Sequence, residues 1–291
     1  MDASMTSLSV LRAALAKHGL SPNPKLGQNF LVDANILRKI VDEVSPNPGE
    51  LILEVGPGAG ALTQAMARRG AWVLALEYDR GLCRLLDELF YSCQRVSIIQ
   101  ADATKEDLAA IARHHAAQMG LYKVKFVSNL PYYLSSDLLY QIIHNILAWE
   151  SITVMLQREV AERVVAFPGT KNYGGLSVAA QAVAEARLAF SVPPGAFWPR
   201  PEVYSSLVIM HPLARPLYGQ CASDFYSLVN AAFRQRRKTL ASALKSLEMD
   251  RQGTAELLAY AGIDSARRGE TLSASEFALL AAAYRSLKHR P

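Results

Sequence analysis

The chain has 291 residues, of which 51% are hydrophobic and 20% are charged. This length is too great for one minimal core and sufficient for two domains, and the composition is ordinary for a soluble globular protein. The net charge of +5 and the isoelectric point of about 9.1 permit an anionic partner without establishing one.

Cysteine usage and hydropathy exclude several other classes. The cysteines Cys83, Cys93 and Cys221 are odd in number and lack CxxC spacing, so we expect free thiols with no disulfide framework and no bound metal. No run of about 18 apolar residues could cross a membrane. Residues 1–25 lack a signal-peptide pattern. Residues 9–20 predict a short amphipathic helix, but Arg12 is the only arginine here and Asp2 is acidic, which is not typical of a transit peptide. We therefore expect a cytoplasmic protein.

Short apolar runs alternate with helical patterns between residues 33 and 210. The predicted strands are 51–55, 72–76, 96–99, 124–127, 152–156, 186–192 and 203–210. Helical patterns between the first five strands include 62–69, 82–91 and 138–147. This alternation predicts an α/β fold with a mostly parallel sheet. The proline-rich loop at 192–201 is too short for a crossover helix, so the last strand is expected to be antiparallel.

The pattern changes near residue 211. Residues 211–220 contain two prolines and one glycine and are interpreted as a linker. After them we expect only helices, at 223–247, 254–261 and 273–287, and Ser273 with Glu276 has the spacing of a capping box. The predicted domains are therefore an α/β domain over 1–212 and a small all-helical domain over 213–291.

A glycine-rich turn follows the first predicted strand. Gly56, Gly58 and Gly60 let a ligand approach the backbone closely. The second strand ends at Glu77, whose carboxylate can accept hydrogen bonds from both hydroxyls of a ribose. Because Gly56, Gly58 and Ala61 also satisfy the dinucleotide pattern, the loop by itself fits NAD, S-adenosylmethionine or a tight turn without any nucleotide.

Asp102 follows the third predicted strand. Its carboxylate suits a hydrogen bond from the amino group of an adenine. It suits equally the N-cap of a helix expected to begin near Lys105, so the residues alone leave both interpretations open.

The fourth strand is followed by Asn129, Leu130, Pro131 and Tyr132. The exocyclic amine of adenine is a poor nucleophile because its lone pair is delocalised into the ring. The side-chain oxygen of Asn129 and the backbone carbonyl of Leu130 can accept hydrogen bonds from the two N–H groups of this amine, which would make the nitrogen more nucleophilic. Pro131 favours an extended Leu130, and Tyr132 offers a face on which an extruded base can stack. Ordinary turn residues are the alternative, but parallel strands end at one edge, which places Asn129 beside the glycine loop.

With these motifs, the sequence resembles the small-subunit ribosomal RNA adenine dimethyltransferases, most closely their bacterial KsgA type. The resemblance covers about residues 11–287, with matching segments at 26–33, 54–58, 129–132, 192–197 and 233–239. It implies a Rossmann-like class I methyltransferase sheet that binds S-adenosyl-L-methionine. Residues 1–32 would supply an N-terminal helix and a segment that folds over the cofactor. Tyr133, Arg200 and Tyr204 depart from common family residues and affect the expected shape of the target pocket.

The resemblance also implies residue roles. The implied cofactor-binding residues are Gln28, Asn29, Leu31, Gly56, Gly58, Glu77, Asp102 and Asn129. The implied catalytic group is Asn129, Leu130, Pro131, Tyr132 and Phe197. Phe197 resembles a second aromatic that lines the pocket for the target base, and a core position under the proline-rich loop is its alternative.

The implied reaction adds two methyl groups to N6 of each of two adjacent adenosines. They lie in a hairpin loop near the 3′ end of small-subunit (16S) RNA. The partners would be this RNA and the assembling small ribosomal subunit, and we expect a monomer. The alternatives are a large-subunit methyltransferase of the macrolide-resistance type, a ribosome-assembly binding factor whose methylation is incidental, and an NAD-dependent oxidoreductase.

Arg234, Arg236, Arg237 and Lys238 form a basic cluster. They are expected near the middle of the helix at 223–247, where their spacing puts three of them on one face. Such a cluster can bind RNA phosphates or can be an ordinary solvated face. The resemblance implies contact with RNA.

Overall fold

The structure is a computed structural model that describes residues 4–130, 135–235, 237–247 and 249–288. The chain divides into two compact units. The first comprises Met1–Ala161 and Arg187–His211, and the second comprises Glu162–Ala186 and Pro212–Pro291. The units differ from the predicted domains because Glu162–Ala186, which precedes the last strands, belongs to the helical unit. The hydrophobic pattern of Glu162–Ala186 indicates its secondary structure but does not indicate which other part of the chain it packs against.

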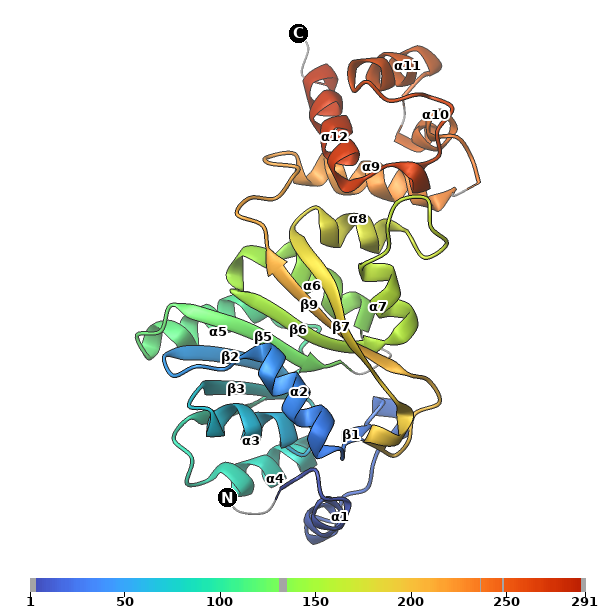
Figure 1. Ribbon diagram of the computed structural model, residues 1–291. Helices are drawn as coiled ribbons and strands as arrows, with labels where there is room; N and C mark the ends of the chain where they lie inside the picture. The colour runs from blue at the N-terminus through green and yellow to red at the C-terminus, as the bar shows by residue number, and fades with distance from the viewer. Residues whose placement is uncertain (1–3, 131–134, 236, 248, 289–291) are drawn as a thin grey trace. The chain divides into compact units, whose positions relative to one another are not determined.

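A seven-stranded sheet has the order β4-β3-β2-β5-β6-β9-β7 (Figure 1). The strands are β2 (Glu50–Val55), β3 (Trp72–Glu77), β4 (Val96–Gln100), β5 (Lys123–Asn129), β6 (Ser151–Gln157), β7 (Ala184–Val192) and β9 (Ser205–Pro212). β2 is parallel to β3 and β5, β3 to β4, and β5 to β6, whereas β9 is antiparallel to β6. The predicted α/β fold, mostly parallel with an antiparallel last strand, is confirmed.

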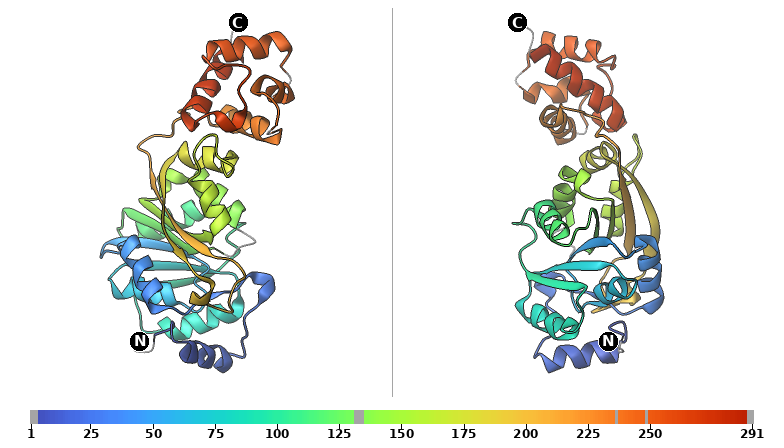
Figure 2. Two further views of the ribbon diagram at one scale, coloured as in Figure 1. Left: turned by 45° about the vertical axis from the view of Figure 1, so that its right-hand side comes forward. Right: turned by 90° about the vertical axis from the view of Figure 1, so that its left-hand side faces the viewer.

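Helices lie on both sides of the sheet (Figure 2). Those of the first unit are α1 (Leu8–Lys17), α2 (Ala34–Val44), α3 (Ala61–Arg68), α4 (Arg80–Phe90), α5 (Leu108–Gln118) and α6 (Ser135–His144), and α7 (Arg158–Val164) follows β6. Aspartates begin three of them: Asp33, Asp79 and Asp107 accept hydrogen bonds from the first free N–H groups of α2, α4 and α5. No helix of the described part of the chain has the length and apolar character needed to cross a bilayer.

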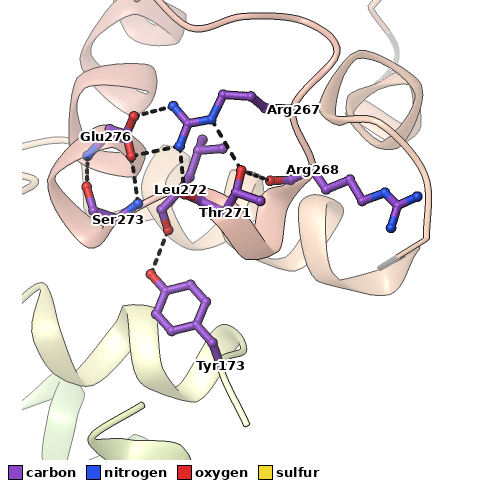
Figure 3. A network of polar contacts seen from close by, with 7 residues as sticks. All are labelled: Tyr173, Arg267, Arg268, Thr271, Leu272, Ser273 and Glu276. Carbon is purple, nitrogen blue, oxygen red and sulfur yellow. Dashed lines mark hydrogen bonds and ion pairs between the residues drawn. The ribbon is translucent and has the colours of Figure 1, made fainter. Parts of the chain in front are cut away.

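The second unit contains α8 (Gly175–Gln181), α9 (Ala222–Arg234), α10 (Leu240–Ala243), α11 (Arg251–Tyr260) and α12 (Ala274–Lys288), with short 3-10 turns at Leu244–Leu247 and Gly269–Thr271. The predicted capping box is confirmed: the N–H of Ser273 donates to Glu276 (2.8 Å), and the N–H of Glu276 donates to the hydroxyl of Ser273 (3.2 Å; Figure 3). The continuous helix predicted over 223–247 is wrong, because α9 ends at Arg234 and α10 begins at Leu240. A continuous helix would place the like charges of Arg234, Arg237 and Lys238 next to one another at i, i+3 and i+4, which is unfavourable.

A buried ion pair ties α2 to the sheet. The ammonium of Lys125 lies 2.9 Å from a carboxylate oxygen of Glu50, and both side chains are only 10% exposed. The same ammonium donates to the carbonyl oxygens of Val44 (3.1 Å) and Ser45 (2.8 Å) where α2 ends. Lys125 therefore satisfies carbonyls at the helix end that have no partner within the helix.

We predict that Lys125→Ala lowers the free energy of unfolding by about 3 kcal/mol, because it leaves the buried Glu50 carboxylate unpaired. Lys123→Ala is the matched control on the same strand. Its pair with Glu150 joins side chains that are 59% and 48% exposed, so its loss should change stability by less than about 1 kcal/mol. Urea unfolding measures both, and equal losses would contradict the role given to Lys125.

Candidate active site

The carboxyl ends of β2, β3 and β5 open onto a cavity of about 320 Å³ within the first unit. Residues 26–31, here called the covering segment, form one wall. The loop after β2 and the residues that follow the other strands form the rest. The cavity brings together these residues singled out in the sequence: Gln28, Asn29, Leu31, Gly56, Gly58, Glu77, Asp102, Asn129 and Leu130.

The loop after β2 turns sharply because its glycines adopt left-handed backbone angles. Gly56, Gly58 and Gly60 have φ values of 68°, 58° and 82°, which residues with a Cβ rarely adopt. The N–H of Gly56 donates to the carbonyl of Leu76 on β3 (2.9 Å). A Cβ on Gly58 would lie 3.2 Å from the ring of Phe30. The covering segment therefore packs directly on the glycine loop.

Glu77 connects this loop to the start of α4. One carboxylate oxygen accepts the N–H of Gly58 (3.2 Å), and the other accepts the N–H of Asp79 (2.9 Å). The side chain is buried, and burial raises its pKa to about 7 despite these hydrogen bonds. Its remaining lone pairs can accept from the hydroxyls of a ligand, which would favour the ionised form.

Glu54 lines the same cavity, and sequence reasoning missed it as a site residue. It is 1% exposed and accepts a 2.6 Å hydrogen bond from the hydroxyl of Thr63. Burial, together with a smaller effect of the nearby Glu77 charge, raises the pKa of Glu54 to about 8 despite the hydrogen bond from Thr63. The sequence signal for Glu54 is an acidic residue near the end of β2, directly after the apolar residues 51–53 and just before the glycine loop.

Asp102 follows β4 and faces the cavity. Its carboxylate accepts from the hydroxyl (2.7 Å) and the N–H (3.1 Å) of Thr104, and it lies 3.3 Å from the ammonium of Lys105. These interactions, the Thr104 hydroxyl first, hold the pKa of Asp102 below its usual value. The N-cap alternative is wrong: α5 begins at Leu108, and Asp107 caps it.

Asn129 is the last residue of β5, and its amide is oriented by the covering segment. The side-chain nitrogen donates to the backbone carbonyl of Asn29 (3.3 Å), so the acceptor oxygen occupies the other arm of the amide. The N–H of Leu130 donates to the carbonyl of Met155 on β6 (3.2 Å), which fixes the chain as it leaves the sheet. Pro131, Tyr132, Tyr133 and Leu134 lie outside the described residues.

Gln28 anchors the covering segment. Its side-chain oxygen accepts the N–H of Asn23 (2.8 Å), and its side-chain nitrogen donates to the carboxylate of Asp79 (3.1 Å). Asn29 similarly donates to the carbonyl of Gly27 (3.0 Å). Both residues line the cavity, and the contact of Gln28 with Asp79 fastens the segment to the start of α4.

A two-stranded sheet joins the covering segment to the proline-rich loop. β1 (Phe30–Leu31) pairs antiparallel with β8 (Phe197–Trp198), which follows a 3-10 turn at Pro194–Ala196. Phe197 is 4% exposed and belongs to an apolar cluster that includes Leu31, Val192 and Leu207. It is not among the residues that line the cavity. The structure therefore places Phe197 in the core position that was its alternative.

The family described as Ribosomal RNA adenine dimethylase matches residues 19–285. The chain belongs to this family. It is 42% identical over 283 residues to the Ribosomal RNA small subunit methyltransferase A of Pelotomaculum thermopropionicum, covering 95% of this chain and 96% of that protein. It is 41% identical over 282 residues to the protein of the same name from Moorella thermoacetica, with the same coverage.

Solved structures similar to this adenine dimethylase include a dimethyladenosine transferase from Plasmodium falciparum, with a TM-score of 0.75 and 20% identity over 88% of this chain and 98% of that chain. The 23S rRNA methyltransferase ErmE has a TM-score of 0.64 and 22% identity, over 88% of this chain and 99% of that chain. At these identities the two structures show a shared fold.

The basic cluster of this adenine dimethylase does not lie in the middle of a helix. Arg234 is the last residue of α9, Arg237 and Lys238 lie in the turn before α10, and all three are exposed. Arg236 lies outside the described residues. The common helix face expected from their spacing is therefore wrong.

We predict that Glu54→Gln reduces the loss of stability at high pH. The pKa of Glu54 is higher in the folded than in the unfolded protein, so the folded protein tolerates this side chain best when it is neutral. Its contribution to the free energy of unfolding is complete below the unfolded pKa of about 4.5 and is lost as the pH rises through about 8. The amide stays neutral and can still accept from Thr63. The free energies of unfolding should be similar at pH 5, and the variant should be more stable at pH 9 by at least roughly 1 kcal/mol. Parallel pH profiles would contradict the burial of an ionisable Glu54.

Proposed function

We propose that this adenine dimethylase transfers methyl groups from S-adenosylmethionine to N6 of two adjacent adenosines near the 3′ end of small-subunit (16S) ribosomal RNA. The products are N6,N6-dimethyladenosines in a hairpin loop, formed as the small subunit matures. The position of Asn129 carries the proposal. Its amide lines one cavity with the glycine loop and Glu77, and the carbonyl of Asn29 orients it.

The cavity residues fit S-adenosylmethionine. The volume of the cavity, about 320 Å³, is typical of a site for a small ligand. The buried carboxylate of Glu77 can accept from ribose hydroxyls, Asp102 can accept from the adenine amino group, and the left-handed glycines expose backbone to the rest of the ligand. When bound, this cofactor supplies a methyl group already activated by a positively charged sulfur.

The side chains then have to hold and polarise the amine. The side-chain oxygen of Asn129 and the backbone carbonyl of Leu130 accept hydrogen bonds from the two N–H groups of the amine, which draws the nitrogen lone pair out of the ring. The nitrogen lone pair would form the new bond to the methyl carbon while the electrons of the carbon–sulfur bond remain on the sulfur. The methylated nitrogen would then be acidic and release its proton to water, so the side chains need supply no strong base. Catalysis is then mainly alignment. We propose Pro131 and Tyr132 as further residues of the site, and Phe197 as a core residue that supports β1 without lining the cavity.

The RNA would be bound in part by the second unit. The exposed cations Arg234, Arg237 and Lys238 are suited to phosphate contacts. We propose that the protein acts as a cytoplasmic monomer on the assembling small subunit. Relatives near 40% identity are named for the small subunit, whereas the likeness to ErmE is one of fold, so a large-subunit substrate has less support. Family membership likewise disfavours an NAD-dependent oxidoreductase.

Asn129→Ala is expected to reduce methyl transfer to unmethylated small subunits by about 100-fold or more, because one of the two acceptors on the amine is lost. Binding of S-adenosylmethionine, measured by calorimetry, should weaken far less. Asn145→Ala is the control, since this exposed amide donates to the backbone carbonyl of Gln141 in the preceding helix (3.2 Å) and is not among the residues that line the cavity. Equal methyl-transfer rates for the two variants would contradict the role of Asn129.

The Asn129→Ala variant also separates catalysis from assembly. If methylation is the main role, small-subunit maturation should slow in cells that carry only this variant. Normal maturation without methylation would favour the alternative of an assembly factor whose methylation is incidental.

A further inference from the structure

The excess positive charge of the chain lies entirely in the second unit. Glu162–Ala186 and Pro212–Pro291 together contain 14 lysines and arginines against 9 aspartates and glutamates, whereas the first unit contains 17 of each. The net charge of +5 is therefore a property of the helical unit. A concentration of positive charge on one unit favours an anionic partner there.

Glu162–Ala186, here called the inserted segment because it lies between the two parts of the first unit in the sequence, carries an exposed aromatic ring. Phe167 is 75% exposed, and residues 168–171 beside it are also exposed. Transfer of a phenylalanine ring from water into contact with a partner is favourable, so a ring presented on an exposed loop can add to the affinity for a molecule that covers it. This ring has no role in the cavity described above.

The loop that carries Phe167 is held in one conformation. The carbonyl of Phe167 accepts both the N–H (3.2 Å) and the hydroxyl (2.7 Å) of Thr170. The N–H of Gly169 donates to the carbonyl of Glu270 (2.8 Å), and the hydroxyl of Tyr173 donates to the carbonyl of Leu272 (2.7 Å; Figure 3). Such a loop can present a ring at little cost in conformational entropy.

These contacts place the loop beside exposed cations. The 3-10 turn that receives Gly169 is preceded by Arg268, which is exposed and extends away from the Arg267–Glu276 network (Figure 3). The turn between α9 and α10 that carries Arg237 and Lys238 is called the basic turn below. The carbonyl of Arg267 accepts the N–H of Leu240, which comes directly after this turn. A Cβ on Gly269 would lie 2.8 Å from the Cβ of Ala232, near the end of α9. These contacts bring the loop, Arg268 and the basic turn close together within the second unit.

We propose that Phe167 is a stacking platform for an unpaired RNA base, with Arg268 and the basic turn binding the phosphates that flank it. Rings interleaved with cations suit single-stranded RNA, because a base stacks on the ring while its backbone follows the positive charge. A duplex offers no open base face and would use only the charge. The inference rests on the proposed RNA substrate and extends the RNA surface from the C-terminal helices to the inserted segment.

The test compares binding of a single-stranded RNA oligonucleotide with binding of the duplex that it forms with its complement, by fluorescence anisotropy. Phe167→Ala should weaken binding of the single strand by about fivefold to a hundredfold and leave binding of the duplex unchanged. Phe167→Leu should behave as Phe167→Ala, because it keeps an apolar side chain without a ring, whereas Phe167→Trp should retain the affinity. Arg268→Ala should weaken both RNAs and reduce the salt dependence of binding.

Tyr260→Ala is the matched control, because Tyr260 is another exposed aromatic of this unit (61%) and lies at the end of α11. It should leave both affinities unchanged. Unchanged single-strand binding in Phe167→Ala, full rescue by Phe167→Leu, or equal weakening for the duplex would each overturn the stacking role. Methyl transfer by the unmodified protein is assayed separately, so failure of the proposed reaction is distinguishable from failure of this contact.

Discussion

The parallel register of three strands determines the site. Val55 on β2 pairs with Leu76 on β3 and with Ser128 on β5. Val55, Leu76 and Ser128 therefore form one row across the sheet, and Gly56, Glu77 and Asn129 are the residues that directly follow them. The ligand loop, the ribose acceptor and the amine acceptor come from segments far apart in sequence, and strand pairing alone brings them to one edge.

The site is covered by residues that precede the sheet in the sequence. The covering segment packs on Gly58, is anchored to the start of α4 by Gln28, and pairs through β1 with the proline-rich loop. Its backbone also receives the amide of Asn129. The same segment that encloses the cofactor cavity thus orients the residue that faces the amine. Two buried carboxyls, Glu54 and Glu77, lie within this enclosure and share a raised pKa because water is excluded from them.

Local sequence predicted what depends on local pattern and on strand order. The strands, the antiparallel last strand and the grouping of Gly56, Glu77, Asp102 and Asn129 followed from periodicity and from the rule that parallel strands end together. The apolar pattern does not indicate the break after Arg234, because Phe233 and Leu240 are seven residues apart, which is also the spacing of two turns of one helix. The membership of Glu162–Ala186 in the helical unit, and the burial of Phe197 behind β1, depend on contacts between distant segments that no local pattern records.

The central claim is that the cavity edge serves the exocyclic amine of adenine in small-subunit RNA. Its most direct test is to incubate the protein and labelled S-adenosylmethionine with small ribosomal subunits that lack the modification, and then to map the labelled nucleosides by mass spectrometry. The account predicts N6,N6-dimethyladenosine at two adjacent positions near the 3′ end of the RNA. Label on another base, on large-subunit RNA, or on no nucleoside would contradict it.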